Sequence, residues 1–162
     1  MRLLLLIALL LPNVRPDGYD IVVVGAGPGG IAAAIQASRD GARVLLLEET
    51  DWIGGQMTAA GVSTMDAGKE VQRRPFGLYA EFVDRIRAYY RRLGKSIGTC
   101  YWNETQVCFE PHVGRDVLTA MLAEAGVEVR LETTVTAVEI SPLGEIRGLK
   151  TTRGPIGTSV VV

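Results

Sequence analysis

The segment that most constrains the fold is an apolar run, Ile21–Val24, followed at once by the glycine-rich turn Gly25–Gly30. An alanine-rich stretch follows the turn, and a second apolar run, Val44–Leu47, ends at the acidic residue Glu48. A lone G-x-G-x-x-G pattern is weak evidence, but here a strand precedes it and a helix and a second strand follow it. The segment therefore predicts a βαβ unit of Rossmann type that binds a dinucleotide.

Three glycines of the turn have distinct physical roles in such a unit. Gly25 permits the tight turn out of the strand, Gly27 has no Cβ and lets the backbone approach a pyrophosphate, and Gly30 lets the helix pack closely on the sheet. The start of the helix offers unpaired N–H groups and the positive end of its dipole to the phosphates. A glycine-rich turn without a ligand is the alternative, which this context disfavours.

The acid at the end of the second strand narrows the choice of dinucleotide. Glu48 follows Gly25 by 23 residues, close to the spacing of about 20 at which an acid binds the ribose. A carboxylate in that position would repel the 2′-phosphate of NADP. The residues alone therefore favour FAD or NAD.

The rest of the chain predicts an α/β fold with a parallel sheet. Continuous apolar runs at 21–24, 44–47 and 160–162 are typical of strands covered on both faces, and Val127–Leu131 predicts one more strand. Helices are expected at 28–39, 76–93 and 111–125. The apolar stripe of the second helix comprises Phe76, Tyr79, Phe82, Val83, Ile86, Tyr90 and Leu93.

An alternating pattern near the end of the chain predicts a β-hairpin. Val135–Ile140 and Ile146–Thr151 flank the turn Ser141–Gly144. A third short strand then leads into Val160–Val162, which makes a meander crossover within the sheet. The chain stops where a further loop would be expected, so we expect the domain to be truncated at its C-terminus.

Composition limits the other possibilities. The 162 residues are 48% apolar with a net charge of −1, so we expect one globular domain and no nucleic-acid partner. Arg2 and the run Leu3–Leu11 resemble a secretory signal peptide, and the run is shorter than the ~20 residues of a membrane span. We expect a signal-like segment at 1–16, a domain at 17–162 and export to the periplasm; the alternatives are a misassigned start codon and a cytoplasmic protein.

Few other residues indicate chemistry. Cys100 and Cys108 either pair or stay free, and with the single His112 they make no convincing zinc site. His112 could transfer a proton, but a structural or exposed role is the more common one for a residue at a helix start. We expect the aromatic and polar residues Tyr101, Trp102 and Asn103 to pack under a loop, and a basic run to form a solvated helix face. That run comprises Arg85, Arg87, Arg91, Arg92 and Lys95. We assign no metal ligand and no catalytic residue.

Longer stretches of the chain resemble a known family. Tyr19–Thr58 resembles the FAD-dependent oxidoreductases of the glutathione-reductase-like superfamily. Gly54–Ser63, Phe109–His112 and Ala125–Val129 are similar to the subgroup named simply FAD-dependent oxidoreductase. The resemblance covers roughly residues 19 to 162, and it implies that the dinucleotide is FAD.

The resemblance also implies a role for each site residue. The FAD pyrophosphate would be wrapped by Gly25, Ala26, Gly27, Pro28, Gly29 and Gly30. Glu48, with Glu49 beside it, would hold the ribose of the AMP half. Gly54, Gly55 and Gln56 would lie beside the pyrophosphate and ribityl chain, and Val135 would line the adenine through its backbone.

The function implied is the transfer of hydride from an unidentified small-molecule substrate to FAD, with a second acceptor that reoxidises the flavin. One alternative is a dinucleotide-dependent biosynthetic or RNA-modifying enzyme on the same fold, which a long basic extension would favour. The other is a non-catalytic fragment that binds nucleotide, which bound flavin that no donor reduces would favour. The oligomeric state stays open.

Overall fold

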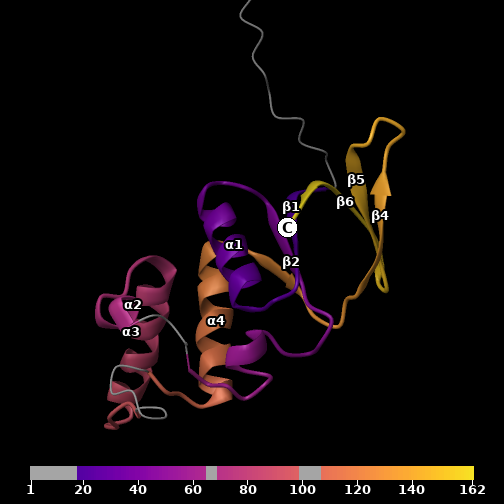
Figure 1. The fold of residues 1–162 in the computed structure, drawn as a ribbon. Helices are drawn as coiled ribbons and strands as arrows, with labels where there is room; N and C mark the ends of the chain where they lie inside the picture. The colour runs from indigo at the N-terminus through magenta and orange to yellow at the C-terminus, as the bar shows by residue number, and fades with distance from the viewer. Residues whose placement is uncertain (1–17, 65–68, 99–106) are drawn as a thin grey trace, which may run out of the picture.

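Two strands and the helix between them form the predicted βαβ unit (Figure 1). β1 (Tyr19–Val24) leads into α1 (Pro28–Arg39), and β2 (Val44–Leu47) pairs in parallel with β1, with Ile21 opposite Val44. Proline at the first helical position has the backbone angle that a helix start needs. The computed structural model describes residues 18–64, 69–98 and 107–162.

The strands form one sheet in the order β3-β2-β1-β6-β5-β4. β3 (Glu128–Arg130) pairs in parallel with β2. β4 (Val135–Ile140) and β5 (Ile146–Thr151) form the predicted antiparallel hairpin. The expected third short strand and the terminal valines are a single strand, β6 (Gly154–Val161), whose first half pairs antiparallel with β5 and whose second half runs parallel to β1.

The helices lie on one side of the parallel strands, and the β4–β6 meander extends to the other side (Figure 1). α1 packs on β1 and β2, and α4 (Pro111–Ala125) packs beside α1 and on β3. α3 (Gly77–Arg92) packs on the outer side of α4. Two short elements that the sequence did not predict are η1 (Gly55–Met57) and α2 (Lys69–Arg73). The three long helices match the expected ranges closely.

Two apolar clusters on opposite faces of the sheet explain why β2 is apolar at every position. Val44 and Leu46 belong to the larger cluster, between the sheet and the helices. Leu45 and Leu47 belong to the second cluster, together with Leu149 of β5. Because neighbouring side chains of a strand point to opposite faces, a strand between two packed layers needs apolar residues throughout.

The prediction that Val160–Val162 is buried on both faces is wrong. Val160 is 43% exposed and Val162 is 59% exposed, because the helices that pack on the sheet do so over β1, β2 and β3 rather than over this strand. The ends of the second predicted helix are also exposed. Phe76 (71%) and Leu93 (54%) flank α3 as its N-cap and C-cap, whereas the middle of the apolar stripe is buried.

An ion-pair network joins the three long helices on their outer surface. Arg39 of α1 contacts Glu81 of α3 at 2.9 Å, and Arg85 of α3 contacts both Glu81 (2.7 Å) and Glu124 of α4 (2.6 Å). The pKa values of Glu81 and Glu124 are lowered chiefly by their hydrogen bonds to Arg39 and Arg85 respectively. The predicted basic face is therefore solvated but also partly paired across helices.

Several expectations concern a membrane span, a metal site and the cysteines. Within the part of the chain that the structure describes, no helix is long and apolar enough to cross a bilayer. The same residues contain no cluster of three or more potential metal ligands. Cys108 is disulfide-bonded, whereas the expectations for residues 1–17, and for Cys100 to Asn103, concern residues outside the described ranges.

We predict that Leu149→Ala destabilises the protein by about 2–5 kcal/mol, because Leu149 is fully buried between the meander and the parallel strands. Urea denaturation followed by circular dichroism measures the change. Val138→Ala is the matched control, since Val138 pairs with Leu149 across β4 and β5 but is 47% exposed. Equal losses for the two variants would show that the meander does not share a core with β1 and β2.

Candidate dinucleotide site

The turn between β1 and α1 has the geometry of an anion site. Gly25 has a φ of +98°, which an L side chain rarely adopts, and its N–H donates to the carbonyl of Leu47 at 2.8 Å. Gly27 is the N-cap of α1; no side chain among the described residues caps the helix, and no acid stands in its first turn. The first N–H groups of α1 and the positive end of its dipole are therefore available to a phosphate.

The surroundings of Gly27 and Gly30 differ. A Cβ at Gly30 would lie 2.0 Å from the carbonyl oxygen of Gly25, so packing within the protein itself requires glycine there. A Cβ at Gly27 would meet no atom of the protein within 4 Å. Contacts among the described residues therefore do not require glycine at position 27, and the space beside its Cα is open to a ligand that approaches the backbone.

The double glycine after β2 packs directly against this turn. Gly54 donates its N–H to the carbonyl of Ala26 at 2.7 Å and has a φ of +100°. A Cβ at Gly55 would lie 3.1 Å from Cα of Gly27. The double glycine is thus held by the turn rather than being a loose connection, and Gln56 follows it as an exposed residue of η1.

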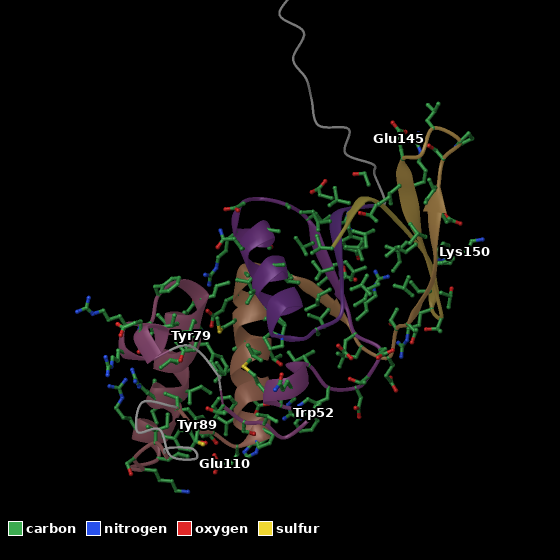
Figure 2. All side chains as sticks on the ribbon, viewed as in Figure 1. Trp52, Tyr79, Tyr89, Glu110, Glu145 and Lys150 are labelled. Atoms are coloured by element: carbon green, nitrogen blue, oxygen red, sulfur yellow. The ribbon has the colours of Figure 1, made fainter. Side chains whose placement is uncertain are left out.

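The loop that carries this double glycine is also attached to α4. Trp52 lies beside α4 in Figure 2, and the guanidinium of Arg115 stacks on its ring at 4.4 Å from the ring centroid. Thr58 closes the other end of the loop, because its hydroxyl donates to the carbonyl of Ile53. The loop therefore presents a fixed surface beside the turn.

Glu48 lies at the carboxyl end of β2 and reaches back to the turn. Its Oε2 accepts the N–H of Ala26 at 2.8 Å, and its Oε1 accepts the N–H and the hydroxyl of Thr50 at 3.0 and 2.8 Å. Burial of the carboxyl group would raise its pKa, but the hydrogen bonds from Thr50 and Ala26 outweigh burial and hold the pKa below the ordinary value of a glutamate. Glu48 is therefore an ionised acceptor at neutral pH.

A cavity of about 250 Å³ opens where β1 and β2 end and β4 begins. Four of the predicted site residues, Gly25, Glu48, Glu49 and Val135, line it, although they come from distant parts of the sequence. Its remaining lining residues are Val24, Leu47, Thr133 and Thr134. The carboxyl ends of parallel strands, beside a change in strand order, are where open α/β sheets bind ligands.

Sequence reasoning missed three threonines. Thr133 and Thr134 line the cavity because β3 and β4 meet there, and Thr50 holds the Glu48 carboxylate. A hydroxyl residue two positions after an acid is a local signal for such a bond, whereas nothing in the sequence marks Thr133 or Thr134. His112, the single histidine, is exposed at the start of α4 and does not line the cavity.

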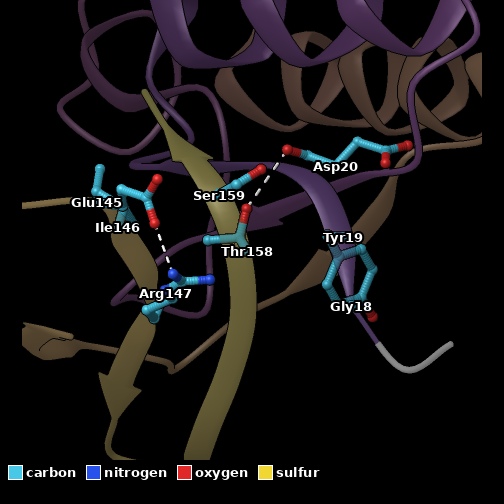
Figure 3. Close-up of a pocket in the computed structure, with 8 residues that line it drawn as sticks. All are labelled: Gly18, Tyr19, Asp20, Glu145, Ile146, Arg147, Thr158 and Ser159. Carbon is cyan, nitrogen blue, oxygen red and sulfur yellow. Dashed lines mark hydrogen bonds and ion pairs between the residues drawn. The ribbon is translucent and has the colours of Figure 1, made fainter. Parts of the chain in front are cut away.

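A second hollow, of about 520 Å³, lies at the other end of β1 (Figure 3). Tyr19, Asp20, Thr158 and Arg147 are among its lining residues, and none of the predicted site residues is. Two of its contacts are internal to its wall: Arg147 pairs with Glu145, and the Thr158 hydroxyl donates to the Asp20 carbonyl. It lies at the amino end of the strand, away from the dinucleotide turn.

The fold and this site define a dinucleotide-binding protein of the Rossmann type. Three observations fit a nucleotide with two phosphates: the uncapped start of α1, the open space at Gly27 and the cavity at Glu48. The cavity is lined by both charged and uncharged side chains, as a nucleoside with a polar sugar and a flat base requires.

Comparison with known proteins identifies the family. The family model described as FAD dependent oxidoreductase matches residues 20–161. The chain belongs to this family of FAD-dependent oxidoreductases, and FAD is its cofactor. The choice between FAD and NAD, which the residues alone left open, is thereby settled in favour of FAD.

Curated relatives match parts of the chain. The chain is 32% identical over 133 residues to digeranylgeranylglycerophospholipid reductase of Methanocella arvoryzae, covering 81% of this chain and 34% of that protein. It is 47% identical over 61 residues to NADH:fumarate oxidoreductase of Klebsiella pneumoniae, covering 38% of this chain and 7% of that protein. The matched part of the chain thus spans 34% or less of the length of these two curated relatives.

A solved structure shows the same fold at low sequence identity. L-proline dehydrogenase from P. horikoshii superposes with a TM-score of 0.58 at 17% identity, covering 91% of this chain and 52% of that chain. The predicted α/β fold with a Rossmann-like FAD-binding sheet is confirmed.

We predict that Glu48→Gln removes part of the acid sensitivity of the fold. The folded-state pKa of Glu48 is lowered, so its contribution to stability is complete above the unfolded pKa of about 4.3 and is lost as pH falls through the folded pKa. The free energy of unfolding of wild type should therefore fall more steeply than that of the variant between about pH 5 and pH 3. Urea titrations across this range measure both slopes.

Other carboxylates with lowered pKa values, such as Glu81 and Glu128, are present in both proteins and cancel in this difference. Parallel slopes would show that the Glu48 carboxylate is not held by Ala26 and Thr50. At neutral pH the variant should lose about 1–2 kcal/mol, because the amide N–H groups of glutamine cannot accept from Thr50.

Proposed function

We propose that the described residues form the cofactor-binding part of an enzyme that transfers hydride from a small-molecule substrate to FAD. The observation that carries the proposal is the continuity of the turn at Gly27 with the cavity at Glu48 and Val135. In the ADP half of FAD the ribose follows the phosphates. In the same order, the turn would hold the phosphates and the ionised acid in the neighbouring cavity would meet the ribose.

In this proposal the start of α1, with Gly27 to Gly30, binds the pyrophosphate through backbone N–H groups. Glu48 accepts from the ribose, and Val135 borders the adenine within the cavity. Gly54 and Gln56 lie along the path from the pyrophosphate to the ribityl chain, because the double glycine packs against the turn. FAD, when bound, supplies the hydride acceptor.

The ionised Glu48 also excludes a competing cofactor. Its pKa is lowered, so a 2′-phosphate on the ribose would face a negative charge. The site therefore favours nucleotides with free ribose hydroxyls, in agreement with FAD.

The similarity to these relatives supports a role in binding the cofactor but does not indicate one substrate. The two curated relatives named above are a digeranylgeranylglycerophospholipid reductase and an NADH:fumarate oxidoreductase, so proteins that are similar to parts of this chain act on unlike molecules. A shared fold does not fix the substrate. We therefore propose a small-molecule substrate without assigning its class.

FAD retention tests the proposal. The purified chain, incubated with FAD and desalted, should keep a two-band flavin absorption spectrum. Gly27→Val should lose the flavin while keeping its circular dichroism spectrum, because the protein leaves open space at this position and the side chain would block only the pyrophosphate.

Two further variants serve as controls. Ser159→Val lies at the distant hollow of Figure 3 and should retain flavin. Gly30→Ala should instead lower the free energy of unfolding by about 1–3 kcal/mol without ligand, because its Cβ would meet the Gly25 carbonyl. A folded wild-type chain that retains no flavin, or a Gly27→Val variant with full flavin content, would contradict the proposal.

The proposal includes export from the cytoplasm. Arg2 and the apolar run Leu3–Leu11 support it, and so does the disulfide at Cys108, since disulfides persist in oxidising compartments. We predict that intact-mass measurement of the protein recovered from the periplasm of an expressing bacterium finds about 16 N-terminal residues removed. Recovery of the full-length chain in the cytoplasm alone would contradict export.

A further inference from the structure

The carboxylate of Glu48 is held at both of its oxygens by short contacts from two different loops. Oε2 accepts the N–H of Ala26 at 2.8 Å, from the dinucleotide turn. Oε1 accepts the N–H of Thr50 at 3.0 Å and its hydroxyl at 2.8 Å, from the loop after β2. A carboxylate oxygen can accept two hydrogen bonds. Thr50 supplies two to Oε1 and Ala26 supplies one to Oε2, while the Glu49 N–H makes a smaller contribution to holding the carboxylate. Oε2 is therefore the oxygen with more room for a ligand hydroxyl.

Thr50 is itself fixed, so it can hold Glu48 in one place. The N–H of Glu132 donates to the Thr50 carbonyl at 2.9 Å, and the N–H of Trp52 donates to the Thr50 hydroxyl at 3.3 Å. The hydroxyl proton has two acceptors within reach, the Glu48 Oε1 at 2.8 Å and the Trp52 carbonyl at 3.0 Å. The charged and nearer carboxylate is the stronger acceptor.

Thr50 is an exposed residue that does not line the cavity. Glu48 does line it, together with Thr133, whose N–H donates to the Glu48 carbonyl at 2.9 Å. The most direct route from the Thr50 side chain to a ligand in the cavity therefore runs through the Glu48 carboxylate. A glutamate without such a contact would lose rotamer freedom on binding, and that loss would weaken the complex.

We propose that Thr50 is a positioning residue, which orders the Glu48 carboxylate before binding so that Oε2 meets the ribose hydroxyls of an adenine nucleotide. The inference rests on the proposed function, because it takes the cavity at Glu48 to be the site of the AMP half. It assigns the discrimination of ribose hydroxyls to a pair of residues: Glu48, which touches the sugar, and Thr50, which holds Glu48.

The test compares two ligands that differ only in the hydroxyls concerned, ADP and 2′,3′-dideoxyadenosine 5′-diphosphate, by calorimetric titration of the full chain. Wild type should bind ADP more tightly. Thr50→Val keeps the shape and the backbone N–H of threonine but loses the hydroxyl. It should weaken ADP binding roughly five- to tenfold and leave the binding of the dideoxy ligand nearly unchanged.

Two variants separate positioning from a general effect on the loop. Thr50→Ser restores the hydroxyl and should recover the wild-type ratio of the two affinities. Thr119→Val makes the same chemical change on α4, where the hydroxyl donates to the carbonyl of Arg115, and should change neither affinity. Circular dichroism establishes that each variant is folded.

The results test the positioning role of Thr50 separately from the proposed binding of FAD. Equal weakening of both ligands by Thr50→Val, failure of Thr50→Ser to restore the ratio, or no effect of Thr50→Val on ADP would each overturn the positioning role while leaving FAD binding intact. A folded wild-type chain that binds neither ADP nor FAD would overturn the proposed function, and the inference with it.

Discussion

The backbone of Ala26 is the point on which the site depends. Its N–H donates to Glu48 at 2.8 Å, and its carbonyl accepts from Gly54 at 2.7 Å. Ala26 is fully buried, so these groups need partners within the protein. Two bonds on one residue thereby join the dinucleotide turn to the end of β2 and to the double glycine, both of which follow the turn by more than 20 residues. The arrangement orders the backbone that we propose binds phosphate before a ligand arrives.

The β4–β6 meander both packs on the parallel strands and lines the cavity. Leu149 and Ile156 cover the face of β1 and β2 that the helices leave open, and the start of β4 places Val135 at the rim of the cavity. One crossover thus completes the core and encloses the adenosine side of the proposed site. The three-stranded antiparallel meander therefore contributes both to the core and to the lining of the cavity.

The sequence predicted the features that local interactions decide and missed those that depend on contacts between distant segments. The glycine turn, the three long helices and the hairpin were predicted because local signals specify them: Pro28 and Pro111 at helix starts, Gly126 at a helix end, and alternation in the hairpin. The exposure of Val160 and the ends of the α3 stripe were not predicted, because burial depends on which layer covers a residue. Thr133 and Thr134 carry no local signal, and only the meeting of β3 and β4 brings them to the cavity.

The sequence by itself determined the βαβ unit, the position of its acid and the family, since spacing and residue type along one stretch of chain encode them. Only the tertiary structure decided what surrounds that acid. Whether Glu48 is held by Ala26 and Thr50, and whether Gly27 faces open space while Gly30 faces a carbonyl, depends on distances between segments. Such distances arise when parallel strands bring their carboxyl ends to one edge of the sheet, which no local pattern records.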